Sequence, residues 1–154
     1  MNETMFDSDR DIRYTMEATA QEVFDAWVTP EIIEQWWGPD GFSAKVHEFD
    51  LVEGGNFVFE MTAPNGKSCF MSGKYKEIQA PNLLVFEIFD HCNLNLPDEV
   101  EPQLETSVVI VNITEKEKFT EIILTHSKLG STYSPLVSVS WLQSLIKLAN
   151  HIVK

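Results

Sequence analysis

The sequence predicts an α+β fold in which a curved antiparallel sheet of about six or seven strands wraps around a long C-terminal helix. The segment 134–154 carries apolar residues at helical spacing, among them Leu142 and Leu145, on a stripe too broad to be left exposed. Between residues 44 and 125, apolar and polar residues alternate with the two-residue period of strands. The pair Asn65-Gly66 lies between two such segments and predicts a type I′ hairpin turn.

A first strand and two short helices precede the main run of strands. The strand is predicted over 12–16, where Ile, Tyr and Met alternate with polar residues. Thr19 and Glu22 have the spacing of a capping box and predict a helix over 20–28. A second helix begins at Thr29-Pro30, because proline is favoured in the first helical turn, and ends at Gly38-Pro39.

The remaining strands are expected to form successive hairpins. An acidic, proline-containing segment from His91 to Gln103 interrupts them and predicts an exposed loop, a candidate lid over an opening in the sheet. No internal repeat or second domain is evident, so we expect a flexible N-terminus over 1–11 and a single domain over 12–154. The strands are predicted over 44–51, 57–62, 69–76, 83–90, 106–114 and 120–125.

Composition excludes several classes of partner and compartment. The chain has 154 residues and a formal net charge of −13, which argues against binding to nucleic acid or an anionic membrane surface. No apolar run is long enough to insert across a membrane, and the acidic start does not have the pattern of a signal peptide. The two cysteines, Cys69 and Cys92, have no metal-ligand spacing. A hairpin could make the two cysteines neighbours, but we expect free buried thiols in a reduced, cytoplasmic protein.

Several short motifs, in order along the chain, resemble one family. They are Ala20-Gln21-Glu22-Val23-Phe24-Asp25-Ala26-Trp27, Trp36-Trp37-Gly38-Pro39, Asp50-Leu51-Val52-Glu53-Gly54-Gly55, Gly73-Lys74-Tyr75-Lys76-Glu77-Ile78, Pro81-Asn82-Leu83-Leu84-Val85-Phe86, Leu124-Thr125-His126-Ser127 and Trp141-Leu142-Gln143-Ser144-Leu145. Together they are similar to the Hsp90-ATPase-activator-like branch of the START-like, or helix-grip, superfamily. The resemblance covers most of residues 12–153. It implies a curved antiparallel sheet that grips the C-terminal helix around an apolar cavity.

A cavity between sheet and helix predicts non-catalytic binding of a small apolar or amphipathic molecule. Methionine and phenylalanine side chains suit such a tolerant apolar site. No catalytic residue, metal ligand or cofactor-binding motif is predicted. The expected cavity residues are Trp37, Phe57, Phe59, Met61, Met71, Tyr75, Phe86, Val109, Val111, His126, Leu142 and Leu145.

Two other functions remain open. The first is a protein-interaction module or a chaperone co-factor of the Hsp90 type, with the acidic surface and the loop 91–103 as contact. That loop or an exposed strand edge also offers a surface for a homodimer. The second is a cavity enzyme of the cyclase or hydrolase type, which needs polar groups that converge inside the cavity.

His126 is the first candidate for such a polar group. Strand parity places it on the inward face, where it either contacts a ligand, acts as an acid or base near pH 7, or hydrogen-bonds structurally. Glu60 and Glu87 form an acid-base pair only if both face the cavity, and alternation favours solvent instead. The run Asp90-His91-Cys92 superficially suggests a metal site, but consecutive strand residues point to opposite faces.

Overall fold

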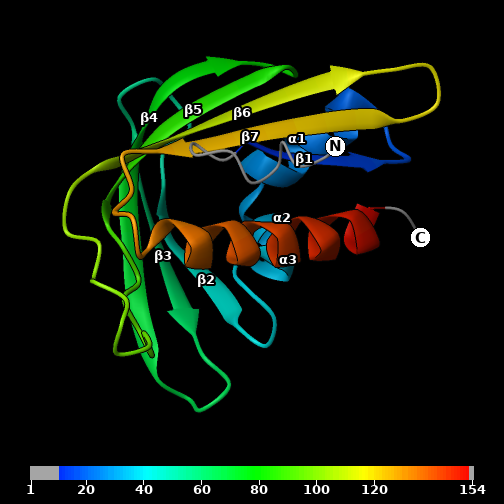
Figure 1. The fold of residues 1–154 in the computed structure, drawn as a ribbon. Helices are drawn as coiled ribbons and strands as arrows, with labels where there is room; N and C mark the ends of the chain where they lie inside the picture. Colours follow the sequence, from blue (N-terminus) through cyan, green and yellow to red (C-terminus); the bar gives the residue numbers. More distant parts are fainter. Residues whose placement is uncertain (1–10, 153–154) are drawn as a thin grey trace.

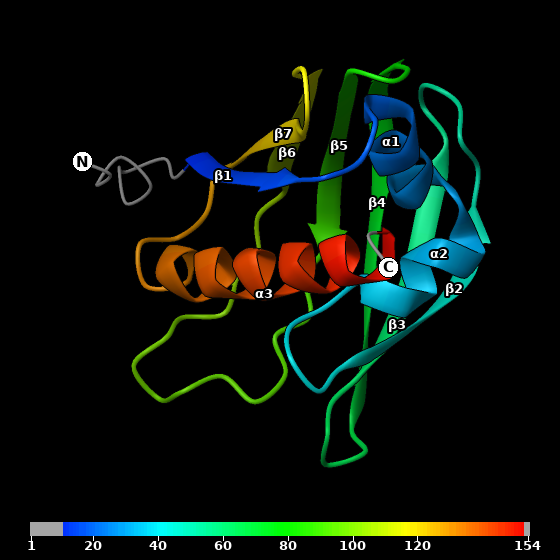
Figure 2. The same ribbon diagram turned by 90° about the vertical axis from the view of Figure 1, so that its right-hand side faces the viewer.

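The computed structural model describes residues 11–152. In Figure 1 a strongly curved sheet bends around the C-terminal helix α3 (Ser134–Ile152), which lies along its concave face. Two short helices, α1 (Ala20–Val28) and α2 (Pro30–Trp36), lie near the C-terminal end of α3 in Figure 2. The α+β helix-grip architecture predicted from the sequence is therefore confirmed.

The sheet has seven antiparallel strands in the order β1-β7-β6-β5-β4-β3-β2. Strands β2 to β7 form consecutive hairpins, whereas β1 pairs with β7, far away in sequence. The helices α1 and α2 connect β1 at one edge to β2 at the other. The strand bounds are Asp11–Met16 (β1), Ser43–Phe49 (β2), Asn56–Thr62 (β3), Ser68–Gln79 (β4), Leu83–Asp90 (β5), Ser107–Glu115 (β6) and Thr120–Ser127 (β7).

Local sequence signals explain most element boundaries. Thr19 and Glu22 form the predicted capping box at the start of α1. The predicted type I′ turn at Asn65-Gly66 is wrong, because Gly66 has a positive φ of 89° but Asn65 does not. The Gly66 amide donates to the Ala63 carbonyl at 2.9 Å, so the turn begins earlier, at Ala63-Pro64. Proline favours the first central position of an ordinary turn.

The main core is a continuous cluster of aromatic rings between the sheet and the short helices. Trp27 of α1 packs edge-on against Trp36 of α2, with ring centroids 4.7 Å apart. Trp37 packs in the same way on Phe59 of β3, at 5.0 Å. Phe57 and Phe86 continue the cluster across β3 and β5. These rings are almost completely buried, so the centre of the concave face is filled.

Gly73 in β4 permits this close packing. A Cβ atom at this position would lie 1.9 Å from the Glu87 carbonyl oxygen and 2.6 Å from the ring of Phe57. Such distances are far shorter than any real contact, so only glycine fits here.

The buried face of α3 is narrower than its sequence suggests. Trp141, Leu145 and Leu148 are buried against the sheet and the short helices, and they follow helical spacing. Leu142 does not face the sheet as predicted; it is 42% exposed. The reason is that it lies about 100° around the helix from Trp141, beside the exposed Val139 and Ile146.

We predict that Leu145→Asp abolishes cooperative folding, whereas Leu142→Asp leaves it intact. Leu145 is fully buried, so an aspartate there places an unpaired charge in the core, at a cost of about 5 kcal/mol or more. At position 142 the same carboxylate reaches water. Urea denaturation followed by circular dichroism measures both variants. A cooperative Leu145→Asp variant would contradict the position given to α3.

Candidate ligand cavity

A cavity of about 390 Å³ opens where the N-terminal half of α3 separates from the sheet. One side is formed by α3, and the opposite side by the ends of β3, β4 and β5. The loop that follows β5 and the segment 37–42 complete the wall. The lining residues are Trp37, Gly38, Pro39, Phe42, Met61, Met71, Ile88, His91, Cys92, Leu94, Asn95, Leu96, His126, Tyr133, Leu136, Val137, Val139, Ser140, Trp141, Gln143 and Ser144.

Only part of the predicted cavity wall lies at this cavity. Trp37, Met61, Met71 and His126 line it. The other predicted residues do not, because the aromatic cluster fills the sheet centre, and Leu142 faces away. The residues that belong to the packed core instead are Phe57, Phe59, Tyr75, Phe86, Val109, Val111 and Leu145.

The segment 37–42 is held against α3 by side chains of the helix. Ser144 Oγ donates to the Gly38 carbonyl at 2.9 Å, and Lys147 Nζ donates to the Pro39 carbonyl at 3.2 Å. Gln143 Oε1 accepts from the Asp40 amide at 3.0 Å. This side of the cavity is therefore fixed to the helix by three separate hydrogen bonds.

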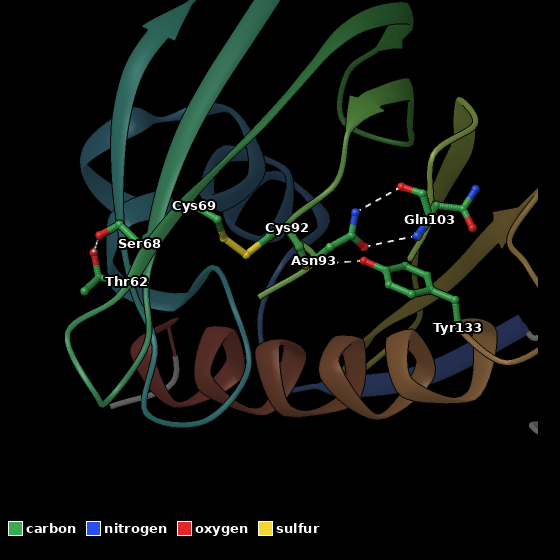
Figure 3. Close-up of a disulfide and its surroundings, with 7 residues drawn as sticks. All are labelled: Thr62, Ser68, Cys69, Cys92, Asn93, Gln103 and Tyr133. Carbon is green, nitrogen blue, oxygen red and sulfur yellow. Dashed lines mark hydrogen bonds between the residues drawn. A yellow bond between two sulfur atoms is a disulfide. The ribbon is translucent and has the colours of Figure 1, made fainter. Parts of the chain in front are cut away.

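The loop between β5 and β6 is anchored at both ends, although the sequence predicts an exposed loop. His91 and Gln103 are buried. Asn93 and Gln103 pair through two hydrogen bonds of 3.1 and 3.2 Å, and the Tyr133 hydroxyl donates to the Cys92 carbonyl (Figure 3). These contacts hold the loop beside the start of α3, where it forms a wall of the cavity.

A disulfide joins Cys69 of β4 to Cys92 at the beginning of the loop, as Figure 3 shows. The prediction of free thiols is therefore wrong. A hairpin that brings the two cysteines together was the less favoured prediction. The β4–β5 hairpin does so, and it places their Cα atoms 5.5 Å apart although they are 23 residues apart in sequence. The bond ties the loop wall to the sheet wall.

We predict that reduction of this disulfide lowers the free energy of unfolding by about 3 kcal/mol. The bond closes the segment between Cys69 and Cys92, and the unfolded chain regains the conformational entropy of that segment when the bond is broken. Thermal unfolding with and without a phosphine reductant measures the effect. The Cys69→Ser/Cys92→Ser double variant is the control, and its melting temperature should not change when the reductant is added. Equal melting temperatures for oxidised and reduced wild-type protein would contradict the prediction.

Behind the cavity wall, four side chains form a continuous hydrogen-bonded series. Trp141 Nε1 donates to His126 Nδ1 at 3.0 Å. His126 Nε2 lies 2.8 Å from Ser107 Oγ, which lies 2.7 Å from His91 Nε2. The series links α3 to β7, β6 and the loop after β5. Sequence reasoning identified His126 but missed Ser107 and the role of His91.

Both imidazoles in the series are neutral near pH 7. Burial, and then the neighbouring His91, lower the pKa of His126 to about 3. Burial lowers the pKa of His91 to about 4, against a smaller opposing effect of Asp90. His126 is thus not an acid or base that titrates near pH 7. Both of its ring nitrogens form hydrogen bonds with side chains, those of Trp141 and Ser107.

Ser107 beside two histidines superficially suggests a nucleophile with its base. However, Ser107 is completely buried and does not line the cavity. A molecule in the cavity therefore cannot reach its hydroxyl, which serves instead to connect the two imidazoles.

The remaining polar candidates lie away from the cavity. Glu60 faces outward as alternation predicts, and its carboxylate is 2.8 Å from His47 Nε2. The pKa of Glu60 is lowered, mainly by the hydrogen bond from His47. A catalytic acid in a cavity would instead need a raised pKa. Glu87 lies outside near Lys76. Within residues 11–152, no cluster of three or more His, Cys, Asp or Glu side chains is placed to hold a metal.

We predict that stability falls as the pH falls from about 6.5 to 5. An unfolded histidine titrates near 6.5, whereas folded His126 titrates near 3, so the unfolded state binds more protons in this window. His126 alone should therefore cost about 2 kcal/mol over that range. Urea denaturation at each pH measures the loss. His126→Asn, whose oxygen can still accept from Trp141, should show a smaller slope; an unchanged slope would contradict the assignment.

The comparisons with known proteins agree with this fold. The family model described as "Activator of Hsp90 ATPase homolog 1-like protein" matches residues 17–152, every element from α1 to α3. A crystal structure of an AHSA1 protein from Silicibacter pomeroyi is 26% identical, with a TM-score of 0.70, and the match covers 92% of this chain and 96% of that one.

Two further structures share the fold at lower identity. A crystal structure from Chromobacterium violaceum has a TM-score of 0.78 at 19% identity, covering 94% of this chain and 99% of that one. A solution structure from Staphylococcus epidermidis has a TM-score of 0.74 at 21% identity, covering 93% and 88%. No curated protein matches the chain. Across 11–152, the helices are each too short or too polar to cross a membrane.

Proposed function

The chain belongs to the family of Activator of Hsp90 ATPase homolog 1-like proteins, and from this premise we propose that it binds a small apolar or amphipathic molecule in the cavity between sheet and C-terminal helix. The observation that carries the proposal is the cavity of about 390 Å³, which lies beside an otherwise filled aromatic core. Its volume falls within the usual range of small-molecule sites.

The chemistry of the lining supports an apolar or amphipathic occupant. Trp37, Met61, Met71 and Ile88 present apolar surface, and methionine adapts readily to different shapes. No Lys, Arg, Asp or Glu is among the lining residues that the described part of the chain contributes. A charged molecule would therefore lose its hydration without gaining a counter-charge.

The alternative function, a protein-interaction module or chaperone co-factor, would use a different surface. Leu142 and Ile146, which do not line the cavity, continue from Val139 at the cavity rim as an exposed apolar stripe along the outer side of α3. Leu142→Asp separates the two functions, because it alters the stripe and leaves the cavity lining unchanged.

We predict that N-phenyl-1-naphthylamine, an uncharged fluorescent probe, binds wild-type protein with one saturable site. Ser140 lines the cavity, so Ser140→Trp fills part of it and should weaken the affinity by about tenfold or more. Ile146→Trp adds the same side chain to the exposed stripe and is the matched control. Fluorescence titration measures both variants.

Native mass spectrometry of protein purified from its own host then asks whether a small molecule co-purifies. Absence of saturable probe binding, or equal affinities in the Ser140→Trp and Ile146→Trp variants, would contradict the proposed site.

A further inference from the structure

The exposed apolar stripe of α3 has the spacing of a helix–helix contact. Its members, Val139, Leu142 and Ile146, are between 40% and 56% exposed. They follow one another at intervals of three and four residues, so they lie in one line along the helix. Side chains with this spacing, β-branched and leucine in alternation, interlock with those of a facing helix. The pattern therefore indicates that a second helix covers the stripe.

Charge narrows the choice of that helix. All 24 acidic residues of the chain precede α3, which contains no Asp or Glu. Because the net charge is −13, two copies of the chain repel each other over most of their surfaces, but they can meet at α3 without carboxylates in contact. A basic partner would find no carboxylate on the stripe. The stripe thus suits an uncharged helix face, which a second copy of α3 supplies.

One acidic residue that contacts α3 has a compensating charge beside it. The Asp40 amide donates to Gln143 Oε1 at 3.0 Å, so its carboxylate lies at the edge of the helix. The Asp40 charge acts to raise the pKa of Lys147, against the larger lowering caused by burial, and this places the two charges close together. The flank of the stripe therefore carries no uncompensated negative charge at this point.

The acidic loop after β5 determines which orientation of the two helices is favourable. The Glu101 amide donates to Thr132 Oγ1 at 2.9 Å, and this bond holds the exposed Asp98 and Glu101 beside the start of α3 (Figure 2). A parallel helix pair would bring two such loops together, and they would repel each other. An antiparallel pair brings each loop towards the other end of the facing helix, where Lys147 and His151 lie.

We propose that two copies of the chain associate through the stripe as a symmetric, antiparallel pair of α3 helices. The two-fold axis passes beside Leu142, so this residue contacts its equivalent, and Val139 of each copy packs against Ile146 of the other. The contact spans only about two turns of helix, so we expect a weak dimer with a Kd on the order of 10 to 100 µM. The inference goes beyond the proposed function and does not depend on it.

Sedimentation velocity between about 1 and 500 µM measures the association. Leu142→Asp places two carboxylates at the axis, so it should raise the Kd at least about tenfold. Val52→Asp is the matched control, because Val52 is 53% exposed in the turn between β2 and β3. It removes a similar apolar surface and adds the same charge, and it should leave the Kd unchanged. Circular dichroism verifies that both variants are folded.

Cysteine cross-linking tests the orientation independently. Val139→Cys and Ile146→Cys each place one thiol on the stripe, whereas Cys69 and Cys92 are joined in a disulfide. In the antiparallel pair, an equal mixture of the two variants should form covalent dimers under mild oxidation, and neither variant should do so alone. A parallel pair would give cross-links in each variant alone.

Wild-type protein that stays monomeric at the highest concentration, or a dimer that Leu142→Asp leaves intact, would overturn the inference. Cross-links in either single variant would overturn the antiparallel arrangement. A monomer that instead binds phosphatidylcholine vesicles or a purified Hsp90 through Leu142 would assign the stripe to that partner, and the inference would be wrong. Probe binding in the cavity is a separate measurement, because Leu142 does not line the cavity.

Discussion

The hydrogen bond from Trp141 to His126 is the interaction on which the site depends. It fixes the proton of one imidazole and, through Ser107, the proton of the next. The same atoms connect α3 to β7, β6 and the loop after β5, so they also determine where the helix lies on the sheet. Burial keeps both rings neutral, because a charged imidazole there would lose its hydration. The position of α3 and the placement of His126 at the cavity wall thus rest on one buried series.

The cavity lies at one end of the helix because the two ends of the concave face are filled differently. Near α1 and α2, four tryptophans pack ring against ring with Phe57 and Phe59 of β3 and Phe86 of β5. Near the start of α3, the described residues 11–152 place no further helix over the sheet, and the loop after β5 lies there instead (Figure 1). The disulfide joins the start of that loop to β4, and Asn93 and Gln103 pair across the loop.

Most of the fold could be predicted because its signals are local. The capping box at Thr19, the two-residue alternation in the strands and the apolar stripe of α3 each depend on residues close in sequence. The family motifs then supplied the arrangement. The site was harder, because it depends on distances between elements. Strand parity placed His126 inward, but no pattern placed Ser107 between it and His91. Likewise, the two-residue alternation places all four of Phe57, Phe86, Met61 and Met71 on the concave face. It could not show that the phenylalanines pack in the core whereas the methionines line the cavity.

Helix α3 has apolar residues on two separate faces, and this explains why Leu142 was wrongly predicted to line the cavity. Trp141 and Leu145 belong to the buried face of α3, whereas Leu142, one residue after Trp141, belongs to the exposed stripe. The positions of apolar residues in the sequence do not distinguish the two faces, because the residues of both faces recur at helical spacing. In space they are separate: the inner face packs on the sheet and borders the cavity, whereas the outer stripe faces solvent. Leu136 and Val139 belong to both the cavity rim and the exposed side, so the stripe and the cavity mouth are continuous. An apolar molecule that reaches α3 from outside therefore meets a path of apolar side chains that leads to the cavity.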